Sequence, residues 1–229
     1  MKQLLFVLLF TPLLMWPQSN FEKGEKLFHA KKFDEAQMAF EEVLKSKPSD
    51  VKSIEYLGDI AAHNKYWKEA VQYYKKLKEL KPAEANYFFK YGAALGMRAS
   101  EVNKFKALGM VDEVKESFEK AIKLNPKHIQ ARWGLVEYYL NLPGIFGGSE
   151  SKAISYSNEL LQLSAVDGYL SRGKIEEYFN RYTTAEKYYI KANEIGKSKI
   201  TFQKLYNLYL NKLKDAKKAR ELKQKFEAS

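Results

Sequence analysis

The sequence predicts an all-α fold, an α-solenoid of about five to six helical hairpins, and three observations support this prediction. Glycine recurs at intervals of 34 residues, at Gly24, Gly58 and Gly92. Proline recurs at the same interval, at Pro48 and Pro82. Alanine does so as well, and an aromatic residue follows each alanine four positions later, in the pairs Ala36 with Phe40 and Ala70 with Tyr74. A 34-residue period is typical of stacked helix-turn-helix units, each burying its apolar face against its neighbours.

Each residue type in the repeat has a physical role. Glycine inside a helix costs about 1 kcal/mol relative to alanine, so its use at Gly24 and Gly58 indicates the close approach of a second helix. The repeated alanines are small for the same reason, and the aromatic residue one turn later fills the wider space beyond. Pro48 and Pro82 each stop a helix. One unit is therefore helix, short turn, helix and stop.

This pattern resembles the tetratricopeptide repeat. The first unit matches at Gly24, Phe33, Ala36, Phe40, Val43 and Pro48, and the second at Leu57, Gly58, Trp67, Ala70, Tyr74, Leu77 and Pro82. The resemblance implies a right-handed solenoid over residues 20–229. Its units are expected at residues 20–50, 51–84, 85–127, 128–165 and 166–199, followed by a degraded capping unit at residues 200–229.

The third unit carries an insertion. The interval from Gly92 to Val114 is 10 residues longer than the interval from Gly58 to Ala70. The inserted stretch, residues 98–110, keeps a helical spacing of apolar residues, and we expect it to lengthen a helix that ends at Gly109, before a new helix capped by Asp112. Such a projecting helix either packs back on the solenoid or offers its apolar stripe to a partner.

The fourth unit carries a second insertion, the glycine-rich stretch at residues 143–149. Glycines before a helix N-terminus are able to cradle a phosphate group. The Walker pattern is absent and no strand is predicted before the stretch, so the favoured interpretation is an inter-helix loop ending in an N-cap at Ser149.

The first 19 residues have the features of a signal peptide. Lys2 supplies a positive charge, an apolar run extends from Leu4 to Trp16, and a polar stretch follows. Thirteen residues are too few to span a membrane, which needs about 20, although an uncleaved anchor is the alternative. The sequence has no cysteine for a disulfide or a lipid. We therefore expect an exported bacterial protein, periplasmic or secreted, cleaved near Ser19.

The positive charge is concentrated at the C-terminus. The formal net charge is +11, and residues 197–229 hold ten Lys and Arg against three Asp and Glu. This segment either binds an anionic lipid, glycan or acidic protein, or gives the terminal helix pair a polar outer face. No nucleic-acid motif is present, so nucleic acid is not an expected partner.

The sequence offers little for catalysis. The zincin, serine-hydrolase and cysteine-nucleophile patterns are absent, which favours a protein that is not an enzyme and has no cofactor. One alternative is a metal site, because Glu25 and His29 lie four residues apart and Asp59 and His63 repeat this arrangement. A pair of salt bridges on the helix surfaces explains the same spacing more simply.

The resemblance also implies a ligand-binding surface. In tetratricopeptide solenoids the first helix of each unit lines a concave groove, which here would carry Glu55, Asp59, Phe89, Trp133, Glu137, Lys174 and Tyr178. Phe89 and Trp133 are the expected apolar anchors, and the acidic residues favour a basic ligand. The Lys and Asn of the family's carboxylate clamp are not at their positions. The function predicted is a non-enzymatic scaffold of the cell envelope that binds a peptide or helix of another protein. The alternative is a structural subunit that associates through its basic C-terminal segment.

Overall fold

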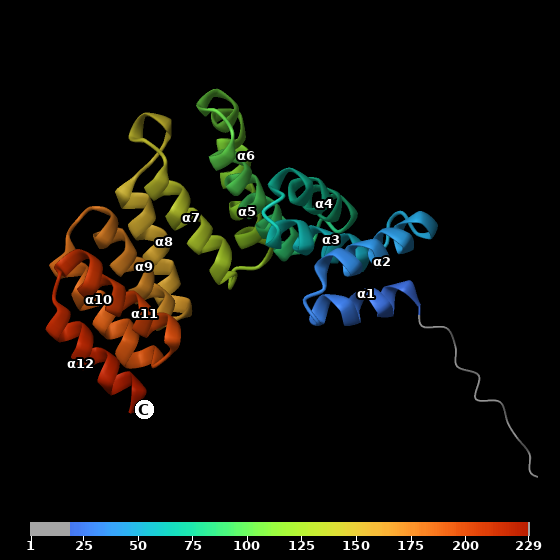
Figure 1. Ribbon diagram of the computed structural model, residues 1–229. Helices are drawn as coiled ribbons and strands as arrows, with labels where there is room; N and C mark the ends of the chain where they lie inside the picture. Colours follow the sequence, from blue (N-terminus) through green and yellow to red (C-terminus); the bar gives the residue numbers. More distant parts are fainter. Residues whose placement is uncertain (1–18, 229) are drawn as a thin grey trace, which may run out of the picture.

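The computed structural model describes residues 19–228, so the predicted signal peptide lies outside the described residues except for Ser19. Helices and turns make up this range, without a strand. The helices pair as six consecutive hairpins: α1 (Asn20–His29) with α2 (Phe33–Ser46), α3 (Val51–His63) with α4 (Trp67–Leu80), α5 (Ala85–Glu101) with α6 (Lys104–Leu124), α7 (Ile129–Asn141) with α8 (Glu150–Leu163), α9 (Ala165–Tyr178) with α10 (Tyr182–Gly196), and α11 (Lys199–Asn207), continued by the π-helical η2 (Leu208–Leu213), with α12 (Ala216–Glu227). The hairpins follow one another in a row (Figure 1). The all-α solenoid predicted from the repeats is confirmed.

The repeated glycine and aromatic residue are in direct contact within each of the first two hairpins. A Cβ atom added to Gly24 would lie 2.7 Å from Cε1 of Phe40, and one added to Gly58 would lie 2.6 Å from Cε1 of Tyr74. Both distances are too short for a side chain, so only glycine lets the ring of the second helix lie on the backbone of the first. The close approach predicted from the sequence is confirmed.

The turns inside hairpins one, two and five share one conformation. Each contains a residue with a positive φ angle: Lys31 at 60°, Lys65 at 60° and Asn180 at 59°. In each case the next backbone N–H donates to the carbonyl five residues earlier, which satisfies a carbonyl at the helix end. Hairpins three and four, which carry the two insertions, are connected differently.

The first insertion lengthens both helices of the third hairpin. α5 has 17 residues and α6 has 21, and α6 runs without a break through Gly109 and Asp112. The predicted C-cap at Gly109 and N-cap at Asp112 are therefore wrong. The turn lies earlier, where the Asn103 side chain accepts a hydrogen bond from the Lys106 backbone N–H at 3.0 Å. An N-cap at this place starts α6, and the cost of one glycine inside a helix, about 1 kcal/mol, is too small to interrupt it.

The second insertion forms a loop with a short 3₁₀ turn, η1 (Gly144–Phe146). The predicted N-cap is confirmed, because Oγ of Ser149 accepts a hydrogen bond from the Lys152 backbone N–H at 3.3 Å. The α5–α6 and α7–α8 hairpins both project toward the top of Figure 1, so the two insertions lie on the same side of the molecule.

The apolar interior is divided into three clusters along the solenoid. The first hairpin and α3 share a cluster around Phe40 and Leu57, a second runs from α3 to α9, and a third joins α9 to α12 around Tyr189 and Leu208. Trp133 is half-buried and contacts both the second and the third cluster. Of the helices in residues 19–228, none combines the length and the hydropathy that crossing a bilayer requires.

Candidate functional site

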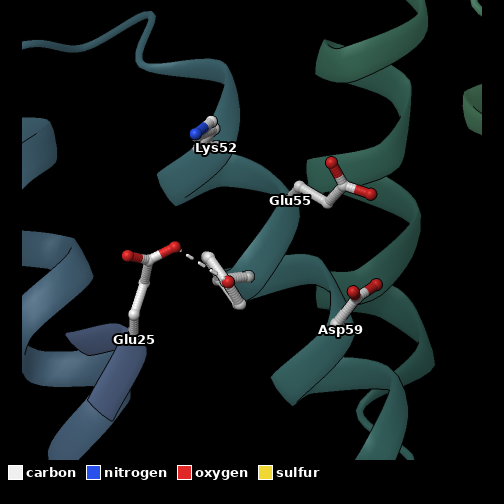
Figure 2. A pocket seen from close by; sticks show the side chains of 5 residues that line it. Glu25, Lys52, Glu55 and Asp59 are labelled. Carbon is white, nitrogen blue, oxygen red and sulfur yellow. Dashed lines mark hydrogen bonds between the residues drawn. The ribbon is translucent and has the colours of Figure 1, made fainter. Parts of the chain in front are cut away.

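A hollow of about 340 Å³ lies between α1 and α3. It is lined by Glu25, Lys52, Glu55, Tyr56 and Asp59, and we call it the first hollow. Lys52, Glu55 and Asp59 share one face of α3, because positions three and four apart in a helix are neighbours. Glu25 approaches from α1, across the gap from them (Figure 2). The predicted groove residues Glu55 and Asp59 are therefore brought together on the face formed by the first helix of each hairpin, which we call the first-helix face.

The carboxylates of Glu55 and Asp59 are bound by residues of neighbouring helices. Nζ of Lys90, on α5, lies 2.7 Å from Glu55 and 2.8 Å from Asp59. The hydroxyl of Tyr87 donates to Glu55 at 2.9 Å, and the hydroxyl of Tyr74 donates to Asp59 at 2.8 Å. Burial, together with these carboxylates, raises the pKa of both tyrosines. Lys90 neutralises much of the negative charge that the sequence places here.

Glu25 differs from the other two carboxylates. Its Oε1 accepts a hydrogen bond from the Tyr56 hydroxyl at 3.1 Å (Figure 2), and no ion pair joins it to any residue of the described part of the chain. Burial and then Glu25 raise the pKa of Tyr56, so the phenol stays a neutral donor. The first hollow therefore keeps one carboxylate that is open to a cationic group.

A second hollow, of about 260 Å³, lies between α7, α9 and α11. Its lining mixes apolar and charged side chains, namely Trp133, Glu137, Asp167, Leu170, Lys174, Ile200 and Lys204. Nε1 of Trp133 donates to Oδ1 of Asp167 at 2.8 Å, which fixes the indole at the edge of the hollow. Three predicted groove residues, Trp133, Glu137 and Lys174, thus lie together on the first-helix face.

In the second hollow, some charged side chains have no ion-pair partner within the described part of the protein, and one large apolar side chain is exposed. Lys174 forms an ion pair with Glu137. Lys204 has no ion pair within residues 19–228, and Ile200 is 67% exposed. An apolar side chain and a free ammonium group are therefore open to a ligand at this end of the solenoid.

The two remaining predicted groove residues line neither of these hollows. Phe89 is half-buried between the third and fourth hairpins, with its ring 6.1 Å from that of Phe118 and 5.2 Å from that of His128. Burial lowers the pKa of His128, and its Nδ1 caps α7 by accepting from the Ala131 backbone N–H. Tyr178 is at the C-terminal end of α9 and lies edge-on to Phe179. The structure thus gives Phe89 a packing role.

The four residues considered for a metal site do not converge. Glu25 and Asp59 are held by the hydrogen bonds described above, and the ring of His63 lies 4.3 Å from that of Phe33. His29 lies against Phe28. The predicted salt bridges are not formed within residues 19–228 either, because Asp59 pairs with Lys90 and Glu25 accepts a hydrogen bond from Tyr56. Within residues 19–228, no three His, Cys, Asp or Glu side chains are grouped so that they could hold a metal ion. The arrangement that the metal hypothesis requires is therefore not found.

A third hollow was not predicted from the sequence. It measures about 560 Å³, lies between α5, α6 and α7, and is mostly apolar. Its lining includes Gly96, Met97, Val114, Phe118, Tyr138 and Leu142. Glu137 lines both the second and the third hollow, so the two are neighbours. The sequence signal that could have found it is the run of small residues at helical spacing between Gly92 and Ser100 of α5.

Comparison with known families agrees with this architecture. The tetratricopeptide repeat family matches the chain at residues 21–85, which hold the first two hairpins, and again at residues 105–128. The chain is a tetratricopeptide repeat protein. No curated protein is detectably similar to it in sequence.

Solved structures of other proteins, among them tetratricopeptide repeat proteins, have the same fold. TTC0263, a thermophilic protein of Thermus thermophilus, is similar with a TM-score of 0.67 and 17% identity over 84% of this chain and 98% of its own. PilW, a type IV pilus biogenesis factor, is similar with a TM-score of 0.66 and 16% identity over 92% of this chain and 91% of its own. YrrB, described as having an unusual peptide-binding site, is similar with a TM-score of 0.55 and 16% identity over 80% of this chain and 87% of its own. At these identities the likeness concerns the fold.

Proposed function

We propose that this tetratricopeptide repeat protein is a non-enzymatic scaffold of the cell envelope that binds a segment of another protein on its first-helix face. The observation that carries the proposal is the second hollow, where Trp133, Leu170 and Ile200 offer apolar surface beside the free ammonium group of Lys204. Aromatic and apolar side chains in a concavity, surrounded by polar groups, are typical of the positions that dominate binding. The peptide-binding site of YrrB, a protein of the same fold, supports this proposal.

The charges of the two hollows suggest a ligand of mixed character. Lys90 and Lys174 already pair with the acidic residues from which a basic ligand was predicted. Among the described residues, the charged groups of these hollows without an ion pair are Glu25 and Lys52 in the first and Asp167 and Lys204 in the second. The ammonium group of Lys52 lies 5.8 Å from the centre of the Phe21 ring, and both carboxylate oxygens of Asp167 accept hydrogen bonds. The groups with the fewest partners are therefore the carboxylate of Glu25 and the ammonium group of Lys204. We therefore propose an extended or helical segment with a basic residue near α1 and an apolar residue beside an acidic one near α11.

The test uses a peptide library displayed on phage and selected against the purified protein. Ile200→Ser removes the exposed apolar side chain of the second hollow and should weaken binding of selected peptides about tenfold, equivalent to about 1.4 kcal/mol. Ile195→Ser is the matched control, because Ile195 is 53% exposed on α10 and does not line the hollow. Isothermal titration gives the dissociation constants.

Trp133 is not the best first substitution, because it also joins two apolar clusters and its loss would disturb folding. If peptides bind Ile200→Ser and Glu25→Gln as tightly as the wild type, the first-helix face is not the binding surface. Selection of no peptide at all from a large library would also count against the proposal.

A second candidate function is association through the basic C-terminal segment, as part of an envelope assembly. On α12, Lys217, Arg220 and Lys225 are exposed, whereas Ala219 is buried against the solenoid. Within residues 19–228, the basic residues of this helix that have carboxylate partners are Lys218, with Glu186, and Lys223, with Glu227. Gel filtration at low and high salt tests this candidate, since association through these lysines would be lost at high ionic strength.

A further inference from the structure

The two insertions carry the most exposed apolar side chains of the structure. We call residues 102–108 and residues 143–149 the two tips; they belong to the α5–α6 and α7–α8 hairpins, which project on the same side of the molecule (Figure 1). Phe105 is 89% exposed and Ile145 is 86% exposed, the highest values among the large apolar side chains of residues 19–228. Phe146 and Leu108 are exposed by 42% and 37%. Such a group of exposed apolar side chains marks a surface for interaction.

The α7–α8 tip has a fixed backbone. The N–H groups of Phe146 and Gly148 both donate to the carbonyl of Pro143. Gly147 has a φ of 99°, and a Cβ atom on Gly148 would lie 1.8 Å from the Leu142 carbonyl oxygen, so neither position accepts another residue without strain. The loop thus holds Ile145 outward, and its internal hydrogen bonds reduce the cost of placing its backbone in a medium with little water.

The free charge at the α5–α6 tip is positive. Lys104 and Lys106 stand on either side of Phe105, both are exposed, and no ion pair joins either of them to another described residue. Asp112, on the same helix, lies about two turns below the tip.

The carboxylates closest in sequence to the tips are already paired. Glu101 forms an ion pair with Arg98 at 3.1 Å, and Glu150 forms one with Arg181. The charge left open to a partner is therefore that of the two lysines, which complements an anionic surface.

We propose that the two tips bind an anionic lipid bilayer. Phe105 and Ile145 enter the interface between headgroups and acyl chains, while Lys104 and Lys106 meet lipid phosphates from their flexible stems. A bilayer fits better than a protein segment because the tips are convex and stand on separate hairpins, with the third hollow between α5 and α7. A broad, fluid bilayer surface contacts both tips at once, whereas a protein segment would be expected to bind inside the third hollow. The proposal is independent of ligand binding on the first-helix face.

The experiment measures insertion at one tip directly. Phe105→Trp places an indole there. The mature protein, without the apolar run from Leu4 to Trp16, is mixed with vesicles of phosphatidylcholine, alone or with phosphatidylglycerol, that contain brominated lipid. We expect a blue shift and quenching of the added fluorescence, relative to the wild type, with the anionic vesicles. Tyr66→Trp is the matched control, because Tyr66 is also exposed, at 59%, but belongs to the α3–α4 turn. Its indole should not be quenched.

Sedimentation with the same vesicles tests the whole surface. The Phe105→Ser, Ile145→Ser double variant should lower the partition coefficient at least tenfold, whereas the Met38→Ser, Ile195→Ser double variant, with exposed apolar residues elsewhere, should not. The Lys104→Gln, Lys106→Gln double variant should make the partition coefficient depend less on salt concentration. The proposal is overturned if the F105W indole is not quenched by anionic vesicles, or if the tip variant sediments like the wild type. An unquenched indole together with a partner protein captured only by wild-type tips would assign the tips to protein recognition.

Discussion

Trp133 of α7 donates its indole hydrogen bond to Asp167 of α9, a residue 34 positions later in the chain, at 2.8 Å. The bond joins two successive hairpins across one repeat period, at the edge of the second hollow. Oδ2 of the same carboxylate also accepts a hydrogen bond from the Ser164 hydroxyl at the N-terminus of α9. The position of the groove indole is therefore set by the cap of the next hairpin.

The first prediction concerns this bond. Trp133→Phe removes the N–H donor and Asp167→Asn removes the charge of the acceptor, and we expect a coupling free energy of about 1 kcal/mol between the two substitutions. Urea unfolding of the wild type, both single variants and the double variant gives this value. Trp67→Phe, on α4, serves as a control and should be additive with Asp167→Asn. Additivity for Trp133 as well would show that the bond contributes nothing measurable.

The second prediction concerns the packing of the hairpins. Ala70 has no exposed surface, so Ala70→Leu should force α4 away from its neighbours and lower the free energy of unfolding by roughly 1–3 kcal/mol. Ala216→Leu, at the exposed start of α12, is the matched control and should change stability by less than about 0.5 kcal/mol. Thermal melting measures both. An unchanged melting temperature for Ala70→Leu would contradict the packing described for this hairpin.

The third prediction concerns alkaline pH. Burial is the largest cause that raises the pKa of Tyr138 and Tyr156 to about 12, and it raises the pKa of Tyr74 and Tyr189 as well. An unfolded tyrosine ionises near pH 10, so the unfolded chain loses protons first. The stability contributed by these groups is complete below about pH 10 and is lost as the pH rises toward their folded pKa values.

We therefore expect the melting temperature to fall steeply above about pH 10. Tyr74→Phe should make this fall less steep, at a cost of about 1 kcal/mol at neutral pH for the hydrogen bond to Asp59. Tyr66→Phe, which changes an exposed tyrosine, should leave the pH dependence as it is. Absorbance at the tyrosinate band during the titration links the loss of structure to ionisation, and ionisation well before unfolding would argue against the mechanism.

The fourth prediction concerns export. The apolar run from Leu4 to Trp16 leads us to expect a mature protein that begins within a few residues of Asn20. Mass spectrometry of the protein from its native host identifies the N-terminus. An intact Met1 recovered in the membrane fraction would instead support an uncleaved anchor.

The sequence predicted the parts of the structure that depend on local spacing. The close approach of a second helix at Gly58 was expected from a glycine inside a helix, and the cap at Ser149 from its place before a helix. That the ring of Tyr74 itself lies against Gly58 was not predicted, because the aromatic residue was expected to fill a wider space beyond the alanine. The turn at Asn103 was missed, because two competing cap signals lay further along the same apolar pattern. When several residues could cap a helix, the local sequence does not show which one does, because the packing of the helices decides where the turn lies.

The pairing of groove side chains was also missed. The sequence places Glu55 and Asp59 on one helix face, but Lys90, which binds both carboxylates, stands about one repeat later. Which long side chain reaches which carboxylate depends on the rotation between hairpins, and the period alone does not determine that rotation. The signal that could have found these pairs is a lysine or tyrosine 31 to 35 residues after Glu25, Glu55 and Asp59. The partner of Glu137 is Lys174, which lies slightly further along the chain.

The contact of glycine with an aromatic ring, which leaves no space even for a methyl group within a hairpin, has a mechanical consequence. Each of the first two hairpins should behave as a stiff plate, so that bending of the solenoid is confined to the seams between plates. A soft seam is expected between α6 and α7. These helices pack against each other less than α4 does with α5, as α10 and α11 also do, and here the third hollow lies beside them in place of packed side chains. A stretching force applied to the two ends of the solenoid should separate α6 from α7 before it separates other helices. Small changes in the angle between these two helices would also change the distance between the first and second hollows on the first-helix face.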